Sequence, residues 1–191
     1  MLAVRKGIIS TLPLTLVGSF FVMFLNFPIP AVAEKLTPFL PILDIPYRFT
    51  VGILALYATF GIASSLAQSY KLDQLTAGII AVMSFIVTSI KPVRLFKEVA
   101  KTNLQTEVVA AGRYLNIANL GAQSLFGAIV TAIISVEIYR FMKVKNITIK
   151  MPEGVPPEVA NYFVALFPAG ACLILFWLIR HMLGFDITAT L

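Results

Sequence analysis

The stretch GIISTLPLTLVGSFFVMFLNFPIPAVA, residues Gly7–Ala33, decides the fold class, because it contains no Asp, Glu, Lys, Arg or His. Four further stretches lack these residues in the same way: Phe49–Tyr70, Gln74–Ile90, Tyr114–Val136 and Val159–Ile179. A helix that crosses the hydrocarbon core of a bilayer needs about 20 mostly apolar residues. A soluble domain of 191 residues has no interior large enough for five such stretches. The sequence therefore predicts a membrane protein with several spans.

The composition agrees with this prediction. Hydrophobic residues make up 59% of the chain and charged residues only 13%, whereas soluble domains carry about 25% charged residues. In lipid, backbone N–H and C=O groups must be satisfied within the protein, so spans are helices or closed barrels. The stretches are continuously apolar and do not alternate, which favours helices. We predict an all-α integral membrane protein with about five transmembrane helices and short interfacial amphipathic helices.

The five spans are bounded mainly by prolines and charged residues. We expect them at Ile8–Phe27, Phe49–Tyr70, Leu75–Ile90, Ile117–Tyr139 and Ala169–Leu183. The small-residue site at Ala31–Ala33 resembles a signal-peptidase site, but Ile8–Phe27 is longer than a signal-peptide core, so we expect this helix to stay.

The segments between the spans are predicted as follows. Ala31–Pro46 has three prolines and is expected to be a connector, whose apolar piece Leu36–Ile42 is too short to span. Val93–Arg113 mixes cations with apolar residues and is predicted to form an amphipathic surface helix. Pro156 and Pro157 mark a helix start, and Pro168 is expected to separate a short interfacial helix from the last span.

Small residues recur at helical spacing in two spans and predict close helix packing. They form three stripes: Gly61, Ser65 and Ser69; Ser124, Ala128 and Ala132; and Gly127, Thr131 and Ser135. Neutral polar residues in the spans are explained equally well by packing or by hydrogen bonds to a neutral solute. These residues are Thr11, Thr15, Thr59, Gln68, Ser84, Gln123 and Thr131.

The charges lie almost entirely between the spans. The net charge of +6 is therefore attributed to topology and lipid headgroups, and no nucleic-acid partner is expected. The two sides carry nearly equal numbers of Lys and Arg, so charge decides the orientation only through the first helix. Arg5 and Lys6 before that helix favour a cytoplasmic N-terminus. Glu137 lies three residues before Arg140, which predicts a same-face ion pair.

No reactive group is identifiable. His181, the one histidine, has only Arg180 and Asp186 nearby in sequence and is predicted to be interfacial. Cys172, the one cysteine, is surrounded by apolar residues and is predicted to be structural. No phosphate loop, nucleotide-binding motif or zinc motif is present. We assign no catalytic, substrate-binding, cofactor or metal residue, and we expect no cofactor.

Four segments resemble a known family. The most specific is NITIKMPEGVPP, Asn146–Pro157, which continues to Phe163–Pro168. The others are Lys6–Ser19 leading into Asn26–Pro30, then Phe60–Gly78, and then Leu120–Gly127 running on to Val136–Arg140. Together they resemble the N-terminal half of the enzyme IIC sugar permease of the bacterial phosphotransferase system (PTS), in its lactose/cellobiose/diacetylchitobiose branch.

The resemblance implies a function and a set of partners. Such permeases have about ten spans and work as homodimers with cytoplasmic IIB and IIA components as partners, and IIB donates a phosphoryl group to the arriving sugar. Residues 1–191 would form one membrane domain, the dimerising scaffold half. The sugar-binding half, with its histidine and glutamate, would be absent. The connector Asn146–Pro157 would be cytoplasmic, and the protein would lie in the bacterial cell membrane with its N-terminus inside.

Two functions follow as expectations. The first is the scaffold half of a permease for a disaccharide-type sugar, forming homodimers through the small-residue stripes and transporting no sugar alone. The second is a non-transporting scaffold or interaction protein that pairs with a separate permease half. An ion carrier or a membrane enzyme would require ionisable residues inside the spans, and the five uncharged stretches contain none.

Overall fold

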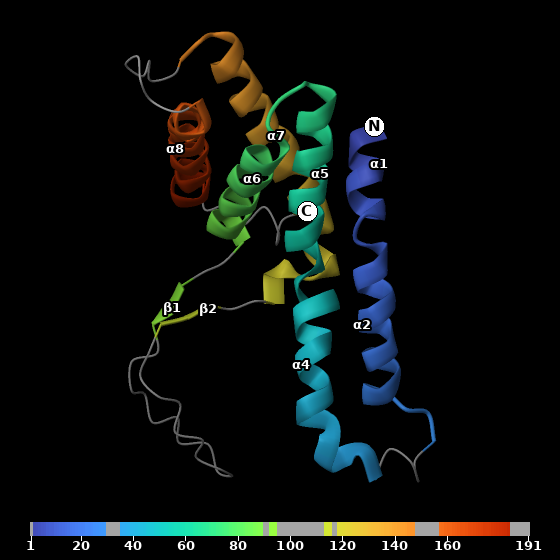
Figure 1. Ribbon diagram of the computed structural model, residues 1–191. Helices are drawn as coiled ribbons and strands as arrows, with labels where there is room; N and C mark the ends of the chain where they lie inside the picture. Colours follow the sequence, from blue (N-terminus) through green and yellow to red (C-terminus); the bar gives the residue numbers. More distant parts are fainter. Residues whose placement is uncertain are drawn as a thin grey trace.

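The computed structural model describes residues 2–29, 35–89, 92–94, 113–115, 118–147 and 157–183 (Figure 1). This part of the chain is helical apart from two short strands, β1 (Pro92–Arg94) and β2 (Arg113–Leu115). The strands pair antiparallel, with Val93 opposite Tyr114. The all-α prediction is confirmed. The prediction of a helix over Val93–Arg113 is wrong at both ends, because these residues lie in the strands β1 and β2. The middle of this segment lies outside the described residues.

The first predicted span is a bent pair of helices, α1 (Leu2–Ile9) and α2 (Leu12–Leu25), inclined at 41°. Pro13, in the first turn of α2, has no N–H to donate to the preceding turn. Two hydroxyls compensate at the bend: Ser10 donates to the carbonyl of Gly7 at 2.6 Å, and Thr11 to that of Ile8 at 2.7 Å. The helix also begins earlier than predicted, so Arg5 and Lys6 lie within α1.

The second predicted span is much longer than expected. A helical run of 33 residues, Thr37–Ser69, contains the 3₁₀ turn η1 (Thr37–Phe39), α4 (Leu40–Thr50), the 3₁₀ turn η2 (Val51–Ile53) and α5 (Leu54–Ser69). The prediction that Ala31–Pro46 is a connector is wrong for its second half.

Two of the three prolines in this run occupy positions that a helix tolerates, and the third lies inside a helix. Pro38 and Pro41 occupy the first turns of η1 and α4, where a missing N–H costs nothing. Pro46 lies inside α4. Its own carbonyl is satisfied by the Thr50 hydroxyl at 2.7 Å. At 1.5 Å per residue the run is about 50 Å long, well beyond the roughly 30 Å of a hydrocarbon core.

The remaining helices form a bundle with α5 at its centre. These are α6 (Gln74–Ser89), α7 (Leu125–Val144) and α8 (Pro157–Leu183), with the 3₁₀ turns η3 (Ala118–Leu120) and η4 (Ala122–Ser124) leading into α7. In Figure 1, α1 packs beside α5 and α2 beside α4, and the α2–α4 hairpin extends beyond the level at which α6 ends. The prediction that Pro168 separates a short interfacial helix from the last span is wrong, since Pro168 lies inside the single helix α8. The start predicted at Pro156 and Pro157 is confirmed.

Within the described residues, length and composition identify three helices that could cross a membrane: Thr37–Ser69, Ala122–Val144 and Val164–His181. The bent pair α1–α2 makes a fourth. The third predicted span is found as α6, within one residue of its expected ends, but it is a shorter apolar helix of 16 residues. All five predicted spans are therefore helices, although α6 is too short to count as a span by length.

Small residues make the core of the bundle. On α5, Ala58, Ala63 and Ala67 are fully buried, and they pack with residues from the other three helices. These are Ala77, Ile80 and Ala81 of α6, Ala132, Val136 and Tyr139 of α7, and Cys172 and Phe176 of α8. The two predicted stripes on α7 are entirely buried inside the chain. They are packing faces, as predicted, but the expectation that they join two copies of the chain is wrong for α7.

The backbones of α1 and α5 approach each other very closely. A Cβ atom added to Gly7 would overlap backbone atoms of Ile62, and one added to Gly61 would overlap the Gly7 carbonyl oxygen. Glycine is required here because the two backbones touch, which leaves no space for a side chain.

We predict that Gly7→Ala separates α1 from α5 and lowers the stability of the folded protein by about 1–3 kcal/mol, the usual range for overpacking a tight contact. Gly170→Ala in α8 is the matched control, because a Cβ there has no atom within 4 Å. Thermal unfolding in detergent would measure both variants. Equal unfolding temperatures for the two variants would contradict the prediction.

Candidate functional site

The one histidine and the one cysteine of the chain contact residues that pack or support the helices. His181 is exposed and stacks on Trp177 one turn earlier in α8, with ring centroids 5.4 Å apart. Cys172 is fully buried, and its Sγ lies 3.8 Å from the Ser135 carbonyl oxygen. Among the described residues, no three His, Cys, Asp or Glu side chains lie close enough to hold a metal ion. Asp186 lies outside the described residues.

Several hydroxyls inside the bundle bond to their own helix and are unavailable to a solute. Thr59 donates to the Ala55 carbonyl at 2.7 Å, and Ser84 donates to that of Ile80 at 2.8 Å. Thr11 and Thr15 do the same near the bend in the first span. For these four residues the packing explanation is therefore favoured over solute binding. The hydroxyls of Ser89, Ser124, Thr131 and Ser135 are buried and have no hydrogen-bond partner within the described part of the chain.

A polar site that sequence analysis did not predict lies at the carboxyl end of α6. The guanidinium of Arg180, in the last turn of α8, donates a hydrogen bond to the Val87 carbonyl oxygen. The side chain of Asn119 in η3 donates to the Ser89 carbonyl at 3.3 Å. These contacts join residues 93 and 30 positions apart in sequence, so no local pattern could have indicated them. From sequence, Arg180 is only a charge near the end of the last span.

A second polar cluster joins the opposite end of the bundle. The Tyr70 hydroxyl, just after α5, donates to Glu137 Oε1 of α7 at 2.5 Å. Arg140 pairs with Glu137 at 3.4 Å, as predicted, and its guanidinium lies 4.2 Å from the centroid of the Tyr70 ring. The hydrogen bond to Glu137 raises the pKa of Tyr70 above its usual value. No sequence pattern indicates Tyr70, because 67 residues separate it from Glu137.

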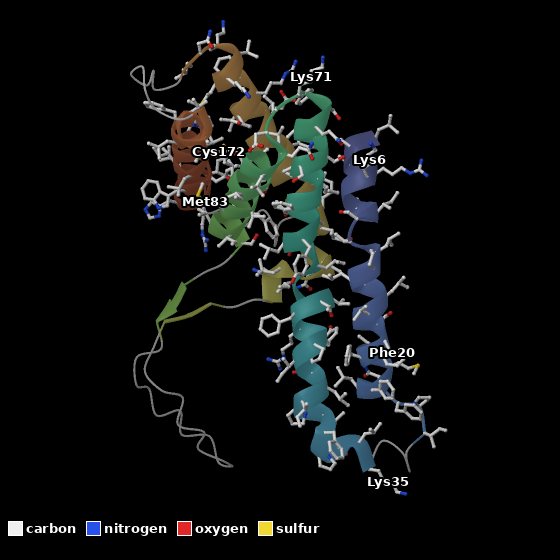
Figure 2. The ribbon with its side chains drawn as sticks, viewed as in Figure 1. Lys6, Phe20, Lys35, Lys71, Met83 and Cys172 are labelled. Atoms are coloured by element: carbon white, nitrogen blue, oxygen red, sulfur yellow. The ribbon has the colours of Figure 1, made fainter. Side chains whose placement is uncertain are left out.

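The turn between α5 and α6 completes this end of the bundle. Asp73 accepts a hydrogen bond from the Thr76 N–H at 2.8 Å and so caps α6. The hydrogen bonds from Thr76, and to a smaller extent the charge of Lys143, lower the pKa of the Asp73 carboxyl. Lys71 has φ of 56°, a left-handed conformation that closes the turn. Figure 2 shows Lys6 and Lys71 at this end and Lys35 at the other.

We predict that Tyr70→Phe destabilises the folded protein by about 1 kcal/mol, the low end for hydrogen bonds to a charged group because the cluster is partly exposed. The contribution is present below pH ~10 and is lost as pH rises through the raised pKa of Tyr70, because the phenolate cannot donate to Glu137. Unfolding of both proteins in detergent across this pH range would measure it.

The control is Tyr47→Phe, because the Tyr47 hydroxyl makes no hydrogen bond among the described residues. It should unfold like the unmodified chain. A Tyr70→Phe variant that matched the control at pH 8 would contradict the prediction.

Comparison with known proteins places these features in a family. The family model described as "Phosphotransferase system, EIIC" matches residues 5–188. The cellobiose-specific EIIC component of Geobacillus stearothermophilus is 40% identical over 186 residues, which cover 95% of this chain and 40% of that protein. The lichenan permease IIC component of Bacillus subtilis (strain 168) is 38% identical over 93% of this chain and 39% of its own length.

A solved structure agrees. The crystal structure of the transporter ChbC, the IIC component from the N,N'-diacetylchitobiose-specific phosphotransferase system, matches with a TM-score of 0.78 and 35% identity. The match covers 96% of this chain and 42% of that one, so the chain spans about two fifths of the length of these relatives. Because the family model and the fold both match almost the whole chain, the chain belongs to the EIIC family of the phosphotransferase system.

Proposed function

We propose that this chain is the scaffold half of a PTS sugar permease that takes up a disaccharide-type sugar of the cellobiose, lactose or diacetylchitobiose class. The observation that carries the proposal is the structural match to ChbC over 96% of this chain at 35% identity. The names of the similar proteins support the sugar class, since they include cellobiose-specific and lactose-specific components.

The division of labour between two halves rests on what the described residues lack. The buried hydroxyls Thr59 and Ser84 bond within their own helices. The remaining polar clusters join one helix to another. Four buried hydroxyls have no partner among the described residues, those of Ser89, Ser124, Thr131 and Ser135, but these residues are at most 1% exposed, so a solute does not reach them. No exposed cluster among the described residues therefore offers the converging free donors and acceptors that would orient a sugar. We assign sugar contact to the part of the relatives that this chain does not match. The phosphoryl group would come from the IIB component, which is fused to the IIC component in lactose-specific EIICB relatives.

We propose a homodimer whose contact is formed by α2 and α4. The α7 stripes are buried within the chain, whereas α2 buries only Gly18 and α4 buries no residue. Their exposed side chains are large and apolar: Leu16, Val17, Phe20 and Met23 on α2, and Phe39, Ile42, Ile45 and Phe49 on α4 and the turn before it. A second copy would cover this surface with packed side chains in place of lipid.

A second candidate function is a scaffold that pairs with a separately encoded permease half and does not itself transport. The coverage of only about two fifths of the relatives supports it. Both candidates share the fold and the membrane location, and they differ in whether the assembled pair moves sugar.

We predict no sugar phosphate inside proteoliposomes that contain this chain alone with IIB, IIA, phosphoenolpyruvate and the soluble phosphotransferase proteins that carry the phosphoryl group from phosphoenolpyruvate to IIA. Adding the remainder of the Geobacillus cellobiose relative as a separate polypeptide should restore phosphorylating cellobiose uptake. Radiolabelled cellobiose would report it, and that remainder without this chain is the control. Uptake by this chain alone would refute the proposal, while co-purification of the two parts without uptake would favour the second candidate.

We also propose that the N-terminus is cytoplasmic and that the membrane is the bacterial plasma membrane. The fold gathers six cations at the end of the bundle that carries the N-terminus. Figure 2 shows Lys6 and Lys71 there, and Arg5 lies beside Lys6 on α1. The other three, Arg140, Lys143 and Lys145, lie at or just after the end of α7, which the bond from Tyr70 to Glu137 places at the same end. At the other end of the described chain, Lys35 is exposed, Arg48 pairs with Asp44, Arg180 bonds to Val87, and the strands β1 and β2 contain Arg94 and Arg113. The two numbers of cations are close, so the proposed orientation is supported by Arg5 and Lys6 in the first helix, which usually dominates.

The orientation predicts opposite labelling of two exposed positions in a Cys172→Ala background. In right-side-out vesicles, a membrane-impermeant maleimide should label the Lys35→Cys variant directly. It should label the Lys71→Cys variant only after permeabilisation. The reverse pattern would overturn the orientation.

A further inference from the structure

Helix α6 ends inside the protein. Its 16 residues give a length of about 24 Å, shorter than the roughly 30 Å of hydrocarbon. The last two residues of the helix, Thr88 and Ser89, are at most 1% exposed. Phe85, one turn earlier, is fully buried in a cluster with Ala55, Leu120 and Ala128. The end of α6 is therefore enclosed by α5, η3 and α7.

An enclosed helix end carries a specific requirement. The last four carbonyls of an α-helix have no partner in their own helix, and away from water they need donors from elsewhere in the protein. Arg180 and Asn119 supply donors to the Val87 and Ser89 carbonyls. The positive charge of Arg180 also matches the partial negative charge at the carboxyl end of a helix.

Arginine suits this position better than lysine. Its planar guanidinium carries five N–H donors and stays protonated even when partly buried, whereas a buried ammonium loses its proton more readily. In the described structure the Arg180 side chain is only partly exposed. Arg180 therefore bonds two helices together, which distinguishes it from a charged residue that contacts only water or lipid headgroups.

The capped end lies where the chain leaves the bundle and returns to it. Residue Ser89 is followed three positions later by β1, and Asn119 lies in η3, four positions after the end of β2. The hydrogen bond between Asn119 and Ser89 thus joins the exit and the return directly. Gly121, next to η3, lies against the Gly52 carbonyl of η2, so the same layer also holds the junction between α4 and α5.

We propose that Arg180 is a positioning residue. Together with Asn119 it closes the end of α6 and holds the exit to β1 and the return through η3 against the bundle. Arg180 thereby couples α8, the last described helix, to the described residues that follow α6 and precede α7. This role is independent of the sugar and of the permease function.

Thiol accessibility along α6 tests the proposal in a Cys172→Ala background. Ser89→Cys probes the capped end, and Ser84→Cys probes the middle of the helix; both serines are fully buried. With Arg180→Gln added, maleimide labelling in nanodiscs should accelerate at least tenfold at position 89 and remain unchanged at position 84. Arg180→Lys should give a smaller acceleration, and Arg5→Gln, an exposed cation at the other end, should give none.

Asn119→Ala is a milder variant that serves if Arg180→Gln does not fold. It removes the bond to Ser89 alone and should accelerate labelling at position 89 by a smaller factor. Unchanged labelling at position 89 in both variants would overturn the proposal and leave Arg180 as a headgroup or topology charge. Equal acceleration at positions 84 and 89 would also overturn it, because it would reveal general loosening of the bundle.

Discussion

The structure depends on one constraint: in hydrocarbon, water is not available to bond to backbone N–H and C=O groups. At several points where a helix in the described chain bends, changes to a 3₁₀ turn or ends, nearby side chains donate hydrogen bonds to its carbonyl groups. Ser10 and Thr11 cover carbonyls at the bend between α1 and α2. Thr50 covers the Pro46 carbonyl just before η2. Arg180 and Asn119 cover the end of α6. Hydroxyl groups and the side chains of Arg180 and Asn119 thus act as donors at points where a helix bends or ends.

Close packing of small residues also stabilises the bundle. Lipid tails are as apolar as leucine, so burying apolar area stabilises helix pairs much less than in water, and dispersion attraction between closely approaching backbones matters more. The alanine-rich face of α5 and the contact of Gly7 with Ile62 provide this approach. The polar cluster of Tyr70, Glu137 and Arg140 then ties α5 to α7 at one end, where headgroups and water begin.

Sequence reasoning reached the fold class, the existence of all five apolar helices and the buried small-residue faces, because these depend on local composition and helical period. It failed where tertiary contacts override a local rule. Proline was expected to end helices, yet Pro46 and Pro168 lie inside α4 and α8. The polar sites were also missed, apart from the pair of Glu137 with Arg140. Tyr70 and Arg180 meet partners dozens of residues away, and a single sequence holds no signal for such pairs.

The contact of Arg180 with Val87 has a consequence for biosynthesis. The ribosome adds about 5–20 residues per second, and 93 positions separate the two residues. The Val87 carbonyl therefore waits roughly 5–20 s for a donor that has not yet been translated, whereas the donor to the Ser89 carbonyl, Asn119, follows after only 30 positions. During that interval the helix must rest beside the translocon, where water or the channel wall can bond to it. Release into lipid would be completed only when α8 arrives, so the order of insertion need not follow the order of synthesis.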